Sequence, residues 1–207
     1  MMPQDLLPRQ FQADCDRFYK RVIMATLNEL AISSDVRGGE FFSLNEFLDN
    51  CEKQTSNLLA YEARRSFALI LAALFERQLR TWARLHFAEG EKEKANTSNF
   101  GPLVLKIADQ QTLDLSAASV HDTISELHLL ANAVRHGHGP AVIQLRKSYP
   151  HFWSHLAEAA LLECETRHLL SEFIQISDGD FVRYIRALTR FWGLADREAG
   201  ATIDGPY

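Results

Sequence analysis

Three polar side chains at helical spacing, His128, Asn132 and His136, are the residues of this chain best suited to chemistry. Positions four residues apart lie along one slowly drifting stripe of a helix. An imidazole can take up or release a proton near neutral pH, and the guanidinium of Arg135 is the kind of group that holds a phosphate. The helix is expected to end at Gly137, because glycine adopts a left-handed conformation at little cost. The spacing predicts either a polar site or a hydrogen-bonded seam at this helix end.

The segment from Asn132 to Gly137 resembles the HEPN family, whose members are small helical bundles and commonly dimers. The family motif is an arginine, usually a following polar residue such as asparagine, a few further residues, and a histidine at the end of a helix. In active members the histidine and arginine of two subunits meet in a cleft and cut RNA without a metal. The resemblance implies that Asn132 and His136 are catalytic. Ala131 occupies the position of the motif's arginine, and Arg135 points about 100° away from His136 on a regular helix.

The apolar helix that ends near Trp82 is similar to the partner helix of HEPN-like bundles. Arg77 and Arg80 on this helix are expected, with Arg135, to bind the phosphate of RNA. The residues expected to support the site are His128, His138 and Glu76. A solvated face is the other interpretation of the arginines at positions 77, 80 and 84, because acidic residues at positions 62 and 76 balance them.

Two further interpretations of the histidines stay open. In the first, the polar groups cap the last carbonyls of the helix and bond to a neighbouring helix, since a buried imidazole is usually satisfied by its neighbours. In the second, His128, His136 and His138 bind a transition metal together with His121. Imidazoles are good zinc or nickel ligands, but these spacings match no standard ligand set. No Gly-rich phosphate loop, HExxH helix or Gly-x-Ser-x-Gly elbow is present in the sequence.

The function implied by the resemblance is metal-independent RNA cleavage, or RNA binding, in a bacterial defence or toxin–antitoxin system. RNA, a protein partner and a second copy of the chain are the expected partners, and no cofactor is expected. Ala131 motivates the alternative of a catalytically inactive helical module that dimerises or holds a protein partner. A relative that keeps the scaffold but loses its phosphate-binding cation would show this substitution.

Composition points to an ordinary globular protein. The chain has 207 residues, of which 46% are hydrophobic and 24% charged, and its net charge of −5 gives no general attraction for polyanions. Three widely spaced cysteines, Cys15, Cys51 and Cys164, argue against a disulfide framework and favour a reducing, cytoplasmic location. No apolar run is long enough to span a membrane. A single domain over residues 1–194, followed by a flexible tail over 195–207, is expected.

Apolar residues recur at three- and four-residue spacings along most of the chain, which predicts an all-α bundle of about five to seven helices. The expected helices are 6–31, 43–88 with an interruption near 55–57, 102–110, 116–137, 140–147, 154–170 and 177–193. Ser43 and Ser177 are expected to cap helices, and Pro140 to occupy a first turn. Residues 89–101 are expected to form a solvated loop and 173–176 an extended segment. The helix over 58–88 is expected to pack against the one over 117–137.

Overall fold

The computed structural model describes residues 6–205, apart from the side chains of Lys94 and Ala118. This range is all-α, as predicted, and contains no strand. None of its helices combines the length and apolar character that crossing a bilayer requires. Residues 206 and 207 of the predicted tail, and residues 1–5, lie outside the described range.

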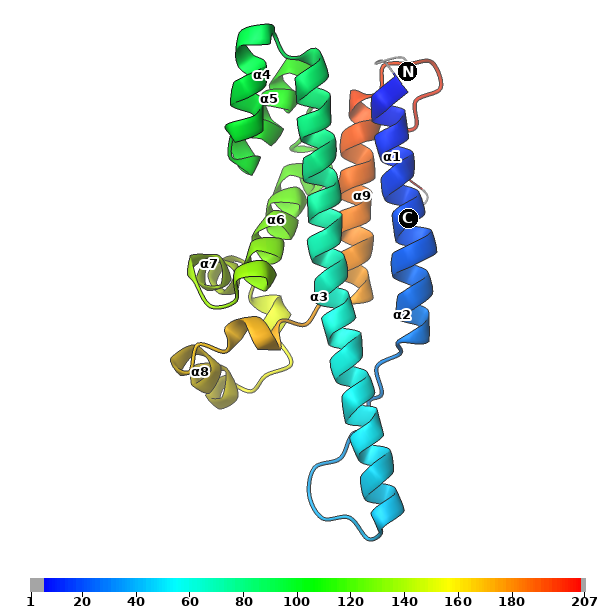
Figure 1. Cartoon of the computed structure of the whole chain (residues 1–207), viewed down its shortest axis with the longest axis vertical. Coiled ribbons are helices and arrows are strands. Elements are labelled where there is room, and N and C mark those ends of the chain that lie inside the picture. The colour runs from blue at the N-terminus through cyan, green and yellow to red at the C-terminus, as the bar shows by residue number, and fades with distance from the viewer. Residues whose placement is uncertain (1–5, 206–207) are drawn as a thin grey trace.

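The long helix α3 (Leu44–His86) is the element around which the others are arranged (Figure 1). Its 43 residues span about 65 Å at 1.5 Å per residue. The predicted cap is confirmed: the Ser43 hydroxyl accepts a hydrogen bond from the Glu46 amide at 3.2 Å, while the Glu46 carboxylate accepts one from the Phe42 amide at 3.0 Å. The predicted interruption near 55–57 is wrong. Asn57 pairs with the backbone of Ser33 and does not compete for the backbone of its own helix.

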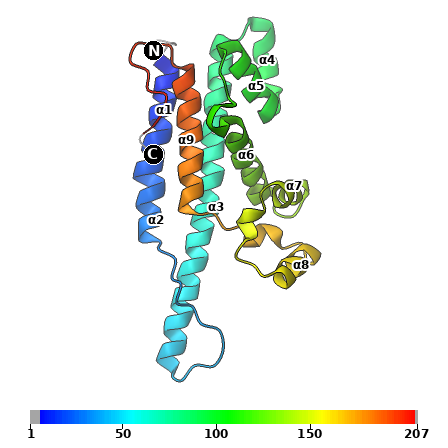
Figure 2. The same ribbon diagram turned by 180° about the vertical axis from the view of Figure 1, so that it is seen from behind.

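Helices α1 and α9 lie side by side along the C-terminal half of α3, as Figures 1 and 2 show. The N-terminal rod runs as α1 (Leu7–Phe18), a π-helical stretch (Tyr19–Met24) and α2 (Ala25–Glu29), and α9 covers Asp178–Ala195. Gln78 of α3 is 4% exposed and joins the three helices. Its amide donates to the Phe11 carbonyl and accepts from the Trp192 indole and the Cys15 thiol, at 3.2, 2.9 and 3.4 Å.

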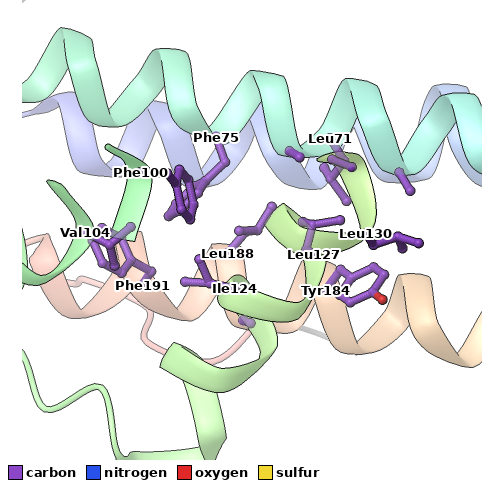
Figure 3. Close-up of a cluster of buried hydrophobic side chains, with 14 of the residues drawn as sticks. Leu71, Phe75, Phe100, Val104, Ile124, Leu127, Leu130, Tyr184, Leu188 and Phe191 are labelled. Atoms are coloured by element: carbon purple, nitrogen blue, oxygen red, sulfur yellow. The ribbon is translucent and has the colours of Figure 1, made fainter. Parts of the chain in front are cut away.

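The remaining helices cover the other side of α3 (Figures 1 and 2). They are α4 (Glu89–Thr97), α5 (Phe100–Gln111), α6 (Val120–His136), α7 (Pro140–Ser148) and α8 (Glu158–Thr166), with 3₁₀ turns at Ala117–Ser119, Pro150–Trp153 and Leu170–Phe173. The predicted packing of α6 against α3 is confirmed. Figure 3 shows Ile124, Leu127 and Leu130 of α6 between Leu71 of α3 and Tyr184 of α9. The apolar residues Val120, Ile124, Leu127 and Leu130 of α6 are buried, and Val134 is half-buried.

The prediction of a loop over 89–101 is wrong, because α4 forms there. The charged sequence has no apolar periodicity, so the helix depends on a tertiary contact. The Arg80 guanidinium of α3 donates to the carbonyls of Ala95, Asn96 and Ser98 at 2.9, 2.9 and 3.2 Å. These bonds satisfy carbonyls at the end of α4 that would otherwise lack a partner in the helix.

Two other boundaries differ from prediction. Ser116 does not cap α6, since its hydroxyl donates to Asp114 at 2.6 Å and a 3₁₀ turn precedes Val120. The predicted helix over 154–170 shortens to α8. Phe152 and Trp153 are both fully buried, and the Trp153 indole donates to the Leu170 carbonyl at 2.8 Å. Burying two consecutive large rings requires the tight turn that precedes α8.

The segment after α9, predicted to be a flexible tail, contacts α1 and α9 over its described residues. Gln12 donates to the Thr202 carbonyl at 2.6 Å, and Arg190 pairs with Asp204. This part of the chain crosses α9 at Gly193. A Cβ atom there would lie 2.5 Å from the Thr202 carbonyl oxygen and 2.9 Å from the Ile203 Cα.

Gly193→Ala is therefore expected to displace residues 200–204 and to lower the free energy of unfolding by about 1–3 kcal/mol, because the new methyl group overpacks against backbone. Chemical denaturation and limited proteolysis of the C-terminus would measure both effects. Gly101→Ala is the control, since no atom lies within 4 Å of its Cβ position. Equal stability and equal proteolysis of Gly193→Ala and the unsubstituted chain would contradict this account.

Candidate functional site at the end of α6

His128 and Asn132 form a half-buried polar seam. The Asn132 amide nitrogen lies 3.0 Å from His128 Nε2, and the imidazole stacks on Phe100 with ring centres 4.0 Å apart and planes inclined by 2°. Burial lowers the pKa of His128; the carboxylate of Glu76 acts against this effect, and Arg135 adds to it. A neutral imidazole can accept the amide hydrogen at Nε2. The seam interpretation thus describes these two residues, which join α6 to the start of α5.

His136 and Arg135 lie apart from this seam, in the last turn of α6. Both side chains are exposed, and neither forms a hydrogen bond or an ion pair within residues 6–205. Gly137 ends the helix with φ 65°, and its amide donates to the Ala133 carbonyl at 3.0 Å. The left-handed conformation confirms the glycine termination that the sequence predicts. The exposed turn presents an imidazole and an adjacent guanidinium to solvent.

The arginines of α3 have different environments. Arg80 donates to the Glu76 carboxylate through Nε and Nη2, at 3.0 and 2.5 Å, besides its bonds to the end of α4. Binding phosphate would require Arg80 to give up these contacts. Arg77 is exposed and has no hydrogen bond or ion pair in the described part of the chain. Arg84 is exposed and bonds Thr81 at 3.1 Å.

The four histidines of the metal interpretation do not come together. His138 lies against His168, with ring centres 4.0 Å apart, while His128 stacks on Phe100. Among the described residues, one group of three has the spacing of metal ligands, and it contains none of these four histidines. The arrangement of the described residues therefore does not support the interpretation of His128, His136 and His138, with His121, as a metal site.

That group belongs to a buried ionic network that the sequence does not predict. We refer to Glu126, His151, Asp180, Arg183 and Tyr184 as the Glu126 cluster. Arg183 binds both oxygens of Glu126, at 2.6 and 3.1 Å, and Asp180 at 2.8 Å. The Tyr184 hydroxyl donates to Glu126 at 2.7 Å. The carboxylates of Glu126 and Asp180 are buried, and His151 Nε2 approaches them from the exposed rim, at 3.8 and 3.6 Å.

The guanidinium of Arg183 occupies the place in this cluster that a metal ion would need. Arg183 Nη2 contacts the same oxygens, Oε1 of Glu126 and Oδ1 of Asp180, that face His151. Burial alone would raise the pKa of Asp180, but hydrogen bonds from Arg183 and Ser177 outweigh burial and hold the pKa below its usual value. Burial and the Glu126 charge raise the pKa of Tyr184. The cluster therefore serves to join α6 to α9. The sequence predicts Ser177 as a helix cap. No local pattern in the sequence indicates that Glu126 shares Arg183 with Asp180.

No protein-family profile, curated protein or solved structure matches this chain. The assignment of a function consequently depends on the residues and their geometry.

The depressed pKa of Asp180 predicts a pH dependence of stability. A carboxyl with a lower pKa in the folded than in the unfolded state stabilises the fold fully above its unfolded value of about 3.8, and this contribution is lost as the pH falls through the folded pKa. The free energy of unfolding is expected to fall more steeply between pH 5 and pH 3 for the unsubstituted chain than for Asp180→Asn. Urea denaturation at several pH values measures the slopes. Asp109→Asn, at an exposed position, is the control, and parallel slopes for all three proteins would refute the prediction.

Proposed function

We propose that this chain is a HEPN-like protein that acts on RNA at the C-terminal end of α6. The observation that supports this function is the exposed pair of His136 and Arg135, neither of which bonds to another group within residues 6–205. An imidazole that is to transfer a proton must reach its substrate, and a guanidinium that is to bind phosphate must have free donors. Arg77 meets the second condition, whereas Arg80 is engaged with Glu76 and α4.

The reaction proposed is attack of a ribose 2′-oxygen on the adjacent phosphorus. The O2′–P bond forms, the P–O5′ bond breaks, the 2′-hydroxyl proton passes to a base, and a proton from an acid reaches O5′. His136 performs one of these two proton transfers, and Arg135 stabilises the charge that develops on the phosphate. A second copy of the chain would supply the second imidazole. RNA and a homodimer are thus the partners proposed, in a bacterial defence or toxin–antitoxin setting.

Binding of a phosphate at the end of α6 requires positively charged side chains. The end of a helix carries a negative partial charge, which repels a phosphate. Binding there depends on the positive charge of Arg135. The three cysteines are free, which is consistent with the reducing cytoplasm proposed as the location.

Purified protein is expected to cleave single-stranded RNA in the presence of EDTA, and His136→Ala to reduce the rate by roughly 10²–10⁴-fold, the usual contribution of an acid–base residue. Arg135→Ala is expected to weaken RNA binding and to reduce its salt dependence by about one phosphate contact. Gel-based cleavage assays and fluorescence anisotropy measure the two effects. His155→Ala, at an exposed site outside α6, is the control. The nuclease proposal fails if the unsubstituted chain does not cut RNA or if His136→Ala cuts it equally well.

A non-catalytic module is the second candidate, and the burial of Ala131 favours it. Ala131 is 2% exposed and packs in the core, so the position of the motif's arginine carries no cation. In this case the end of α6 holds a second copy or a protein partner without chemistry. Such a protein would sediment as a dimer, and Arg135→Glu together with His136→Glu would dissociate it while RNA stays intact. A monomer at all concentrations would exclude self-association through this surface.

A further inference from the structure

The N-terminal part of α3 projects from the body of the protein. Figures 1 and 2 both show it extending beyond the other helices, accompanied by the chain segment that precedes it. We call residues 44–62 the arm. A helix without tertiary packing on one side is expected to expose polar residues there. The arm instead exposes large apolar side chains.

Large apolar side chains gather on one side of the arm. They are Leu44, Phe47, Leu48, Leu58 and Leu59, with exposed fractions of 71, 45, 52, 63 and 58%. At 100° per residue these positions fall within a sector of about 120°, so they form one stripe along the helix. Exposed apolar residues scattered singly are normal, but two groups on the same side of one helix, at positions 44–48 and 58–59, have the form of a binding surface.

The segment preceding the arm is fixed on another side and leaves the stripe open. Asn50 accepts from the Arg37 amide at 2.8 Å and donates to its carbonyl at 3.1 Å. Asn57 pairs in the same way with Ser33, at 2.8 Å for both bonds. The two asparagines are seven residues apart and lie about 120–140° round the helix from the centre of the stripe. The five side chains of the stripe stay largely exposed, and the ring contact that the preceding segment makes with them in the described range is that of Phe41 with Phe47, with centres 5.5 Å apart.

The flank of the stripe is acidic. Residues 30–62 contain six acidic and two basic side chains, a net charge of −4 out of the −5 of the whole chain. Both basic residues pair within this segment, Lys53 with Asp35 and Arg37 with Asp35 and Glu46. Glu52 is exposed about 80° round the helix from the centre of the stripe and Asp49 about 140°, and neither forms an ion pair within the described range. A partner that covers the stripe must accommodate these charges.

Charge excludes two otherwise suitable occupants. In an antiparallel pair of identical helices the same flank of each faces the other, which would set Glu52 against its copy and bring together two segments of net charge −4. An anionic membrane surface would be repelled in the same way. A partner with lysine or arginine along its edge would instead gain ion pairs.

A depression continues the stripe toward the body of the protein. Leu58 and Tyr61 of the arm line it together with Leu156, Phe173 and Ile174. Its volume of about 260 Å³ is sufficient for one large side chain. Central pockets filled by aromatic or large aliphatic anchors supply much of the energy of protein interfaces.

We propose that the stripe binds an amphipathic helix of another protein, with apolar residues at three- and four-residue spacing and Lys or Arg on its flank. The apolar side chains pack along the arm, basic side chains on the flank pair with Glu52, and one large side chain enters the depression beside Leu58. This binding mode is helix-in-groove recognition. It does not depend on the function proposed for α6.

Two synthetic 18-residue peptides with the same leucine pattern, one with lysine and one with glutamate flanks, would test this proposal by fluorescence anisotropy with the full chain. The basic peptide is expected to bind at micromolar concentration, more weakly at higher salt, and the acidic peptide at least tenfold more weakly. Leu48→Asp with Leu59→Asp should weaken the basic peptide at least tenfold. Glu52→Lys should shift the preference toward the acidic peptide.

Ile143→Asp is the matched control, because this exposed apolar residue lies on α7, away from the arm. All substituted side chains are exposed, and circular dichroism verifies that the variants stay folded. Equal binding of both peptides, binding of neither, or an Ile143→Asp effect as large as that of the arm variant would overturn the proposal. So would a dimer that Leu48→Asp dissociates, or binding of the arm to vesicles of phosphatidylcholine and phosphatidylglycerol.

Discussion

The packing of α1, α6 and α9 against the C-terminal half of α3 is the interaction on which every other part of the structure depends. Phe75 contacts the rings of Phe100, Phe191 and Trp192, with centres 5.2 to 6.3 Å apart. Gln78, one turn further along, lies among these apolar groups and would destabilise them if its amide lacked partners. Its three bonds to α1 and α9 fix how the helices are rotated against one another.

The Glu126 cluster likewise fixes how α6 and α9 are rotated against one another. Two buried carboxylates share one guanidinium, and removing that guanidinium would leave both without their arginine partner, which is strongly destabilising for buried charges. Because Glu126 must face Arg183 while His128 stacks on Phe100, α6 has little freedom to rotate about its axis. The exposure of Arg135 and His136 in the last turn follows from these two contacts. The ionic network thus positions the candidate site without belonging to it.

Local signals in the sequence identified the helix ends correctly where one residue determines the geometry, as at Ser43, Gly137, Pro140 and Ser177. Local signals failed where a side chain distant in the sequence determines the structure. Arg80 binds carbonyls at the end of helix α4, and no periodicity in residues 89–97 shows this contact. The same limit applies to the site. The spacing of His128, Asn132 and His136 on one side of a helix is visible in the sequence. That His128 and Asn132 form a bonded pair while His136 is exposed depends on Phe100 and on the rotation of α6.

The distribution of charge changes what the net charge of the chain implies. Residues 30–62 carry −4, so the remaining residues contain 20 basic and 21 acidic side chains and are close to neutral. A net charge of −5, averaged over the whole chain, argued against attraction of polyanions. Fields of exposed charges decay within about 10 Å in physiological salt, so acids on the projecting arm have little effect at distant surfaces. The negative net charge of this protein therefore resides mainly in residues 30–62, and it does not exclude RNA from the end of α6.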